Sequence, residues 1–325
     1  MIYLYILIIS FISSLIFVRL SINAKWKTKK SGAPSISCAG GLGIYAAFLI
    51  AIIVAVFLRH IYGLKLIGLI ISSGMILVLG FIDDLYDLLP SIKIIGTILG
   101  IIALILFGFV TKIMFLPVWL NIVITALWLL FITNALNLLD IMDGLASGLT
   151  LIISLTLLVV SLVNRDIFSS SVLIALIGAH SGFLRYNYPP ARVYMGDAGS
   201  LFSGFLLAAI AINISYAPSD RPVALITPIL VLSFPIYDTL FLIAMRVKKS
   251  RPIFKKTKDH FALRLVIMGN SVRKSVLIMY SFSAFLALGA LVVAFGSNIT
   301  GLGMLAVIIL VFILLGRIVA MVDVS

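Results

Sequence analysis

The sequence predicts an all-α integral membrane protein, a polytopic bundle of about eleven transmembrane helices, and three observations support this prediction. First, 63% of the 325 residues are hydrophobic and 11% are charged, whereas a soluble domain is about 45–50% apolar and about 25% charged. Second, apolar runs of bilayer-spanning length recur along the chain. Third, Lys and Arg are unevenly divided between alternate loops. This composition excludes a large soluble domain, a disordered scaffold and a nucleic-acid-binding module.

The predicted spans follow one another with short loops and no internal repeat, so a single domain over residues 1–325 is expected. The first run is too long, and too lightly charged at its start, for a cleaved signal peptide. Polar or Gly/Pro clusters separate the runs. The eleven spans are residues 1–20, 40–58, 65–82, 92–110, 114–133, 145–163, 170–184, 200–215, 222–245, 275–295 and 301–320.

The basic residues predict the orientation of the bundle. With eleven spans, the loops after the odd-numbered spans share one side with the C-terminus, and 19 of the 24 Lys and Arg residues lie there. The positive-inside rule then places the N-terminus outside and the C-terminus in the cytoplasm. The net charge of +13 therefore marks the cytoplasmic side. The basic segment 246–274 has two interpretations, an anchor to anionic lipid headgroups or a loop that grips phosphate.

The acidic residues are distributed in a way that orientation does not require. All eleven are Asp, and only Asp166 and Asp220 lie in predicted outer loops. Because Asp contributes little to orientation, short carboxylates beside basic loops predict a metal-phosphate site at the cytoplasmic surface. The single Cys38 excludes an intramolecular disulfide and a thiolate zinc cluster. His180 and His60 are expected to be packing or interfacial residues.

The first motif is the run Gly-Phe-Ile-Asp-Asp-Leu-Tyr-Asp at residues 80–87. Adjacent carboxylates such as Asp83 and Asp84 repel, so one proton affinity rises or a cation lies between them. This arrangement suits a general base or magnesium bound together with phosphates. Lys93 begins the next predicted helix, where its amine and free backbone amides can both meet a phosphate. A solvated loop between helices is the alternative.

The second motif places Asn134, Asn137, Asp140 and Asp143 three residues apart. On a helix this spacing puts them close to one face, descending from the membrane edge. Polar groups at the mouth of an apolar bundle are costly unless they are used. The alternative is a set of helix caps and interhelical hydrogen bonds.

The third motif is Gly-Asp-Ala-Gly-Ser at residues 196–200, directly before an apolar run. It predicts a tight turn that places Asp197 at the start of a helix. Gly196 and Gly199 would let the backbone approach an anion, and the helix dipole would favour it. A plain N-capping turn is the alternative.

Together, these motifs resemble those of the polyprenyl-phosphate N-acetylhexosamine-1-phosphate transferases. The match covers residues 80–97, 133–148, 182–205 and 235–260, in order and spacing. The resemblance implies transfer of a sugar 1-phosphate from a UDP-sugar to a polyprenyl phosphate such as undecaprenyl phosphate. UMP would leave at the cytoplasmic face of the cell membrane, in the first membrane step of envelope polysaccharide synthesis. The family's cofactor is Mg²⁺, with Mn²⁺ as a substitute, and a homodimer is compatible with it.

The resemblance also implies roles for individual residues. As metal ligands it implies Asp197 and Asn137. It implies a catalytic set in which Asp83 acts as the base. The members of this set are Asp83, Asp84, Asp140, Asp143 and His260. As substrate-binding residues it implies Lys93, Asn134, Asn187, Arg192 and Arg264.

The chain departs from the family pattern at three places. The early His and Pro-Arg-x-Gly-Gly are replaced by Gly32 and the run Ser-Cys-Ala-Gly-Gly at 37–41, and the usual Gln is Thr97. The last loop, usually Asp-His-x-His-His-Arg, reads Asp-His-Phe-Ala-Leu-Arg at 259–264. We predict that Arg264, with its planar fork of donors, grips the diphosphate in place of the missing histidines.

These departures bear on the substrate. The loss of two histidines favours the N-acetylglucosamine branch over the phospho-N-acetylmuramoyl-pentapeptide branch, which stays an alternative together with other UDP-N-acetylhexosamines. A non-catalytic lipid-binding member and a transporter are more remote alternatives. A transporter would usually show repeats and charges at the membrane midplane, whereas these acids lie at one surface.

Overall fold

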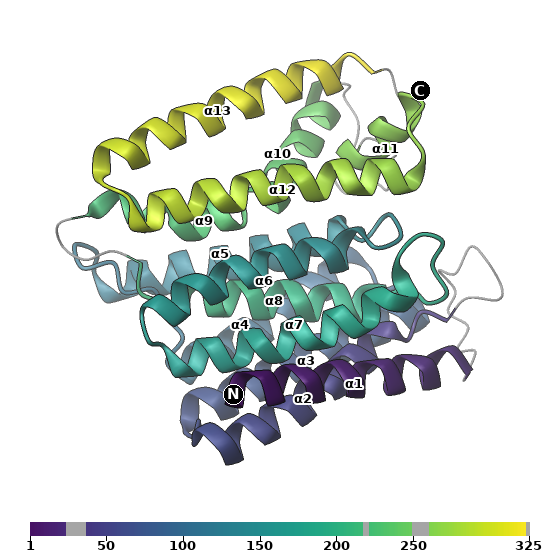
Figure 1. Ribbon diagram of the computed structural model, residues 1–325, viewed down its shortest axis with the longest axis vertical. Helices are drawn as coiled ribbons and strands as arrows, with labels where there is room; N and C mark the ends of the chain where they lie inside the picture. Colours follow the sequence, from purple (N-terminus) through teal and green to yellow (C-terminus); the bar gives the residue numbers. More distant parts are fainter. Residues whose placement is uncertain (24–36, 217–220, 249–259, 323–325) are drawn as a thin grey trace. The chain divides into compact units, whose positions relative to one another are not determined.

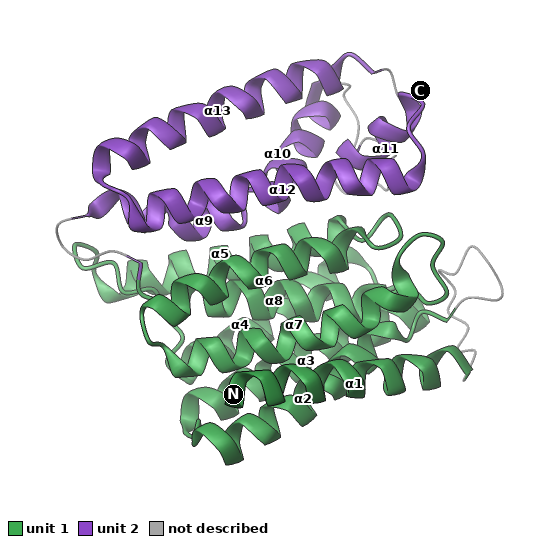
Figure 2. Ribbon diagram, viewed as in Figure 1, with its two compact units in different colours: residues 1–215 green, residues 216–325 purple. Residues whose placement is uncertain are grey.

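The computed structural model describes residues 1–23, 37–216, 221–248 and 260–322. The chain divides into two compact units, residues 1–215 and residues 216–325 (Figure 2). Every regular element in the described ranges is a helix, apart from one isolated bridge between Ser37 and Val193. The prediction of one domain concerns how the units are joined, and it stays a prediction.

Unit 1 is a bundle of helices whose bounds closely follow the first eight predicted spans (Figure 1). They are α1 (Ile2–Asn23), α2 (Gly40–Arg59), α3 (Leu64–Tyr86), α4 (Pro90–Leu106), α5 (Val118–Leu138), α6 (Leu145–Val163), α7 (Ile167–Asn187) and α8 (Gly196–Asn213).

The centre of unit 1 is formed by α7 and α8. In each of them 78% of the most apolar stretch is buried, against 22% in α1. The α8 helix packs against α2, α3, α5 and α6. The buried His180 ring of α7 contacts the hydroxyls of Ser147 on α6, at 3.2 Å, and Ser203 on α8, at 2.9 Å. This agrees with a packing role for His180, and it fixes the three inner helices to one another.

The α4 helix is shorter than its predicted span of 92–110. It ends at Leu106, because Gly108 has a positive φ of 87°. The segment that follows is held by side chains of α5: the Thr125 hydroxyl accepts from the Thr111 amide at 2.9 Å, and the Asn121 side-chain oxygen accepts from the Ile113 amide at 3.0 Å. These hydrogen bonds satisfy backbone groups that a longer helix would otherwise pair.

Unit 2 contains the remaining helices. They are η1 (Pro222–Ile226), α9 (Thr227–Val231), α10 (Ser233–Lys248), α11 (Phe261–Ile267), α12 (Val272–Phe295) and α13 (Asn298–Ala320).

The predicted span 222–245 is broken in unit 2. The η1–α9 segment and α10 meet at an angle of 67°. Proline explains the break, since Pro228 and Pro235 flank it and cannot donate backbone hydrogen bonds. The Ser233 hydroxyl donates instead to the Leu230 carbonyl at 2.6 Å.

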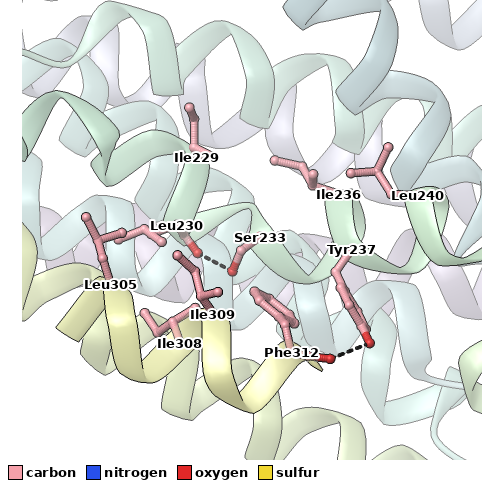
Figure 3. Close-up of a pocket in the computed structure, with 10 residues that line it drawn as sticks. All are labelled: Ile229, Leu230, Ser233, Ile236, Tyr237, Leu240, Leu305, Ile308, Ile309 and Phe312. Carbon is pink, nitrogen blue, oxygen red and sulfur yellow. Dashed lines mark hydrogen bonds between the residues drawn. The ribbon is translucent and has the colours of Figure 1, made fainter. Parts of the chain in front are cut away.

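An apolar groove of about 210 Å³ lies beside this bend, and α13 forms its other wall (Figure 3). The Tyr237 hydroxyl crosses from α10 to the Phe312 carbonyl at 2.9 Å. The groove is lined by Ile229, Leu230, Ser233, Ile236, Tyr237, Leu240, Leu305, Ile308, Ile309 and Phe312.

Within the described ranges, nine helices are long and apolar enough to cross a membrane, or ten when the bent pair counts as one span. The α4 helix is apolar but shorter, at 17 residues. Many large apolar side chains also face outward, as in a protein whose solvent is lipid. The all-helical, polytopic fold is therefore as predicted, while the total of eleven spans and the orientation stay predictions.

Candidate active site

Three helix ends meet at one end of unit 1, and glycines allow their backbones to touch. A Cβ atom on Gly41, at the start of α2, would lie 2.3 Å from the Gly199 nitrogen of α8. A Cβ atom on Gly80, near the end of α3, would lie 2.4 Å from the Asp197 carbonyl oxygen. No side chain fits between these backbones. The contacts bring the Asp pair of α3 against the first turn of α8.

Asp84 caps α8 from the neighbouring helix. One of its carboxylate oxygens accepts a hydrogen bond from the Asp197 amide at 2.9 Å, and the other accepts from the Ala198 amide at 3.1 Å. The anion predicted at this helix N-terminus is therefore the carboxylate of Asp84. The residue is 3% exposed. This geometry gives Asp84 a positioning role and counts against the predicted catalytic one.

Lys93 joins two carboxylates that lie far apart in the sequence. Its ammonium is 2.6 Å from Asp83 Oδ2 and 3.0 Å from Asp197 Oδ2. The Asp83 side chain is fully buried, and its other oxygen accepts from the Leu88 amide at 2.8 Å. The side chains of Lys93 and Asp197 are 24% and 21% exposed, so the cluster opens to the surface on their side.

Asn137 completes this cluster from α5. Its side-chain nitrogen donates to Asp197 Oδ1 at 3.1 Å and to the Ser200 hydroxyl at 2.8 Å. Asn134 does not extend the group as predicted, because its side chain donates to the Leu130 carbonyl one turn earlier, at 2.7 Å.

The predicted polar stripe on a single helix is therefore wrong beyond Asn137. The α5 helix ends at Leu138, and the chain turns through residues 139–144 to Gly144, whose φ is 76°. Asp140 and Asp143 consequently lie on this turn rather than on the helix.

Asp140 lies in a strongly acidic environment. Burial, together with the nearby carboxylates of Asp197, Asp84 and Asp143, raises its pKa to about 8. Four Asp side chains thus act on one another electrostatically at this end of unit 1. Such a concentration of negative charge favours a cation.

Asn187 and Asp143 tie together the two loops beside the cluster. The Asn187 side chain accepts from the Gly144 amide at 2.9 Å and donates to the Val193 carbonyl at 2.8 Å. Asp143 accepts from the Ala191 amide at 2.9 Å. Since Asn187 is 3% exposed and uses both ends of its amide internally, it holds the loops in place and is not presented to a substrate as predicted.

The segment that departs from the family pattern is part of the same structure. The Tyr194 amide donates to the Ser37 carbonyl at 2.9 Å, and the Gly40 and Gly41 amides donate to the Tyr194 and Met195 carbonyls at 3.1 and 3.0 Å. In the sequence, residues 37–41 stand out only as a departure from the family pattern. The adjacent glycines were the available signal for a close backbone approach.

Arg192 lies on the loop that these contacts hold. The residue is exposed, and its backbone amide donates to the Tyr186 carbonyl at 2.8 Å. Its predicted role in substrate binding stays a prediction.

His260 and Arg264 belong to unit 2. His260 Nδ1 lies 3.3 Å from Asp238 Oδ2, and the other oxygen of Asp238 accepts from the Phe261 amide at 3.0 Å, which caps α11. Both His260 and Asp238 are buried. Asp238 has no role predicted from the sequence, although it lies in one of the matching segments. Asp259 lies outside the described residues.

Arg264 has a different environment from the one predicted. It is fully buried, and its guanidinium donates to the carbonyls of Val319 and Val322, at 3.2 and 2.6 Å, at the C-terminal end of α13. The guanidinium also lies 5.5 Å from the centre of the Phe241 ring. A cation at a helix C-terminus stabilises that end of the helix. This burial argues against the predicted grip on a diphosphate and favours a structural role.

The donor set in unit 1 fits a magnesium ion. The described residues contain no group of three or more His, Cys, Asp or Glu side chains placed to hold a metal. Magnesium, however, is usually held by one or two carboxylates together with substrate phosphates and water. Asp83 and Asp197 already converge on one positive charge, that of Lys93. Two hard oxygen ligands that meet at one point are suitable for this ion.

Comparison with known proteins places this bundle in a class of membrane transferases. Residues 66–215, which run from α3 to the end of unit 1, match the family described as Glycosyl transferase family 4. A probable undecaprenyl-phosphate N-acetylglucosaminyl 1-phosphate transferase of Bacillus subtilis is 32% identical over 262 residues, which are 78% of this chain and 72% of that protein. The chain therefore belongs to glycosyl transferase family 4.

Two further relatives are named for different transferred groups. A decaprenyl-phosphate N-acetylglucosaminephosphotransferase of Mycolicibacterium smegmatis is 30% identical over an alignment of 284 residues that covers 77% of this chain and 70% of that protein. A phospho-N-acetylmuramoyl-pentapeptide-transferase of Caldicellulosiruptor bescii is 34% identical over 207 residues, but these are 57% of this chain and 61% of that protein. The resemblance stated from the motifs is thereby confirmed at the level of the family.

Proposed function

We propose that this protein transfers N-acetylglucosamine 1-phosphate from UDP-N-acetylglucosamine to a polyprenyl phosphate, with release of UMP, at the cytoplasmic face of the cell membrane. The observation that carries the proposal is the cluster of Asp83, Lys93, Asn137 and Asp197 at one end of an apolar bundle. The relatives named for N-acetylglucosamine match more of the chain than the pentapeptide transferase does, which supports this choice of sugar.

The chemistry of phosphoryl transfer depends mainly on alignment and charge neutralisation. When bound, Mg²⁺ supplies positive charge against the diphosphate and the attacking phosphate. Asp197 and Asp83 would hold the ion, and Asn137 fixes the orientation of the Asp197 carboxylate. Asp84 keeps the first turn of α8, and therefore Asp197, in position.

Asp83 is better suited to hold a cation than to act as the predicted base. Its carboxylate is fully buried, ion-paired with Lys93 and hydrogen-bonded to the Leu88 amide. A phosphate monoester has a second pKa of about 6, so a polyprenyl phosphate is largely a dianion at neutral pH and needs no strong base. In our proposal the lipid phosphate attacks directly, and the surrounding positive charge stabilises the transition state.

The reaction is tested with the full-length protein in lipid nanodiscs. Undecaprenyl phosphate and Mg²⁺ are supplied with UDP-N-acetylglucosamine, UDP-N-acetylgalactosamine or UDP-N-acetylmuramoyl-pentapeptide, and UMP and the lipid product are measured by mass spectrometry. We expect turnover with the first donor and its loss in excess chelator. Turnover with the pentapeptide donor alone would show that the protein is instead a phospho-N-acetylmuramoyl-pentapeptide transferase. No turnover with any donor would favour a non-catalytic role.

The cytoplasmic placement of the site is tested by labelling in intact cells. Two variants are compared, Arg192→Cys and Arg165→Cys. Arg192 lies beside the cluster, and Arg165 lies at the opposite end of unit 1, between α6 and α7. The natural Cys38 is buried, so background labelling should be low. An impermeant thiol reagent should label the cysteine at 165 and spare the one at 192. The reverse pattern would place the cluster outside.

A further inference from the structure

We propose that Lys93 and a divalent cation compete for the carboxylates of Asp83 and Asp197. When the metal binds, the Lys93 ammonium leaves these carboxylates and contacts the substrate diphosphate instead. This inference rests on the proposed function, since it concerns the same metal and the same diphosphate. It adds that the metal displaces the Lys93 ammonium first, and that the ammonium contributes to diphosphate binding only afterwards.

The competition follows from the contacts that Lys93 makes. Its ammonium hydrogen-bonds both carboxylates, at 2.6 and 3.0 Å, through the oxygens that converge on it. A divalent cation held by the same two oxygens would face the ammonium at close range. Like charges a few Å apart repel strongly where solvent is partly excluded. Lys93 must therefore leave at least Asp197 before a metal can use both carboxylates.

The surroundings allow Lys93 to move while the carboxylates stay in place. The Lys93 backbone is anchored in the first turn of α4 by a hydrogen bond from its amide to the Leu89 carbonyl at 3.2 Å. Its flexible side chain is 24% exposed, and a lysine stem can change direction at little cost. The Asn137 amide holds the other oxygen of Asp197 at 3.1 Å. Among the contacts described for this cluster, the exchange changes those of the ammonium.

The released ammonium has a suitable new partner. Lysine is a mobile point charge that binds phosphate oxygens well, and the sequence position of Lys93 predicts a phosphate contact. On this proposal the amine contributes little to diphosphate binding until the metal has displaced it. The lysine thereby links substrate binding to metal binding.

The first experiment measures metal affinity, without turnover, by Mn²⁺ electron paramagnetic resonance on the full-length protein. Lys93→Met removes the competing charge, and Lys65→Met is the matched control. Lys65 belongs to the same unit but donates to the Asn213 side chain rather than to a carboxylate. We expect Mn²⁺ to bind about tenfold more tightly in Lys93→Met and as in the wild type in Lys65→Met.

Equal Mn²⁺ affinity in the wild type and Lys93→Met would overturn the exchange and leave the metal site standing. Absence of Mn²⁺ binding in both proteins would overturn the metal part of the proposed function, and the exchange with it. The two failures are therefore distinguishable.

The second experiment uses the wild type alone, so it does not depend on the folding of a variant. The lysines are reductively methylated with and without Mg²⁺, and each site is quantified by mass spectrometry. We expect Mg²⁺ to raise the modification of Lys93 several-fold and to leave Lys65 unchanged. Unchanged or reduced modification of Lys93, at a metal concentration where Mn²⁺ binding is saturated, would overturn the proposal.

Discussion

Two aspartates in different units make the same kind of contact in different surroundings. Asp84 of α3 accepts hydrogen bonds from the first amides of α8, and Asp238 of α10 accepts one from the first amide of α11. Around Asp84 lie further carboxylates and an ammonium that reaches the surface. Asp238 is paired with the buried His260. An aspartate in a family motif can therefore cap the N-terminus of a helix. The groups around that aspartate decide whether a ligand site is present.

The largest effect is expected at Asp197, whose carboxylate is partly exposed whereas that of Asp83 is fully buried. Asp197→Asn keeps the shape of the side chain but removes a charged metal ligand. We expect transferase activity to fall by about a thousandfold or more, by analogy with the loss of other transition-state charge stabilisers, while the yield of folded protein is maintained. Near-normal turnover at saturating Mg²⁺ would exclude Asp197 as a ligand.

Asp84 should show a smaller loss of activity and a loss of stability. Asp84→Ala leaves the amides of residues 197 and 198 without an acceptor, which typically costs about 1–2 kcal/mol. We expect activity to fall by about 10- to 100-fold, with Asp84→Asn between the alanine variant and the wild type. Thermal unfolding and turnover are measured in the same nanodiscs. A variant that loses activity without any loss of stability would restore the catalytic role for Asp84.

Arg264 tests the unit 2 side of the comparison, where we expect an effect on stability alone. Arg264→Met removes the charge that caps α13, and loss of such a buried group typically costs about 3 kcal/mol. In the protein that still folds, the KM for the UDP-sugar should change by less than about threefold, because the side chain is fully buried. A large rise in KM without destabilisation would support the diphosphate grip predicted from the sequence.

Asp140 is tested through the pH dependence of stability and not through activity. Because its pKa is raised to about 8, the folded chelator-treated protein holds a proton that the unfolded chain releases near pH 4. Stability should therefore fall as the pH rises from about 4 to 8, by at most about 1.4 kcal/mol per pH unit. Asp140→Asn should flatten this slope in thermal unfolding experiments. Parallel profiles for the two proteins would contradict the raised pKa.

Much of the fold could be predicted because lipid leaves few options for an apolar run. The predicted span 145–163 coincides with α6, and 40–58 differs from α2 by one residue. The bend at α9–α10 was not predicted, because hydropathy carries no information about backbone hydrogen bonding. Pro228 and Pro235 were the signal for it.

The site could be predicted in part. Spacing identified the segments that carry Asp83, Lys93, Asn137 and Asp197, which the structure brings together. It could not tell that Asn187 would use its whole amide within the protein, because that depends on loops brought together by folding. The buried environment of Arg264 was not predicted for the same reason, since its partners lie 55 and 58 residues further along the chain.

The glycine contacts of unit 1 also limit which substitutions these helices can accept. Gly41 and Gly80 face backbone atoms of α8 so closely that even a methyl group would push the helices apart, whereas a Cβ atom on Gly303 in α13 would meet no atom within 4 Å. The distance between the carboxylates is thus set by contacts between main-chain atoms, and no substitution can bring these helices closer together. A side chain at Gly41 or Gly80 would therefore move the carboxylates apart, whereas a substitution at an exposed loop position such as Arg192 leaves this frame in place.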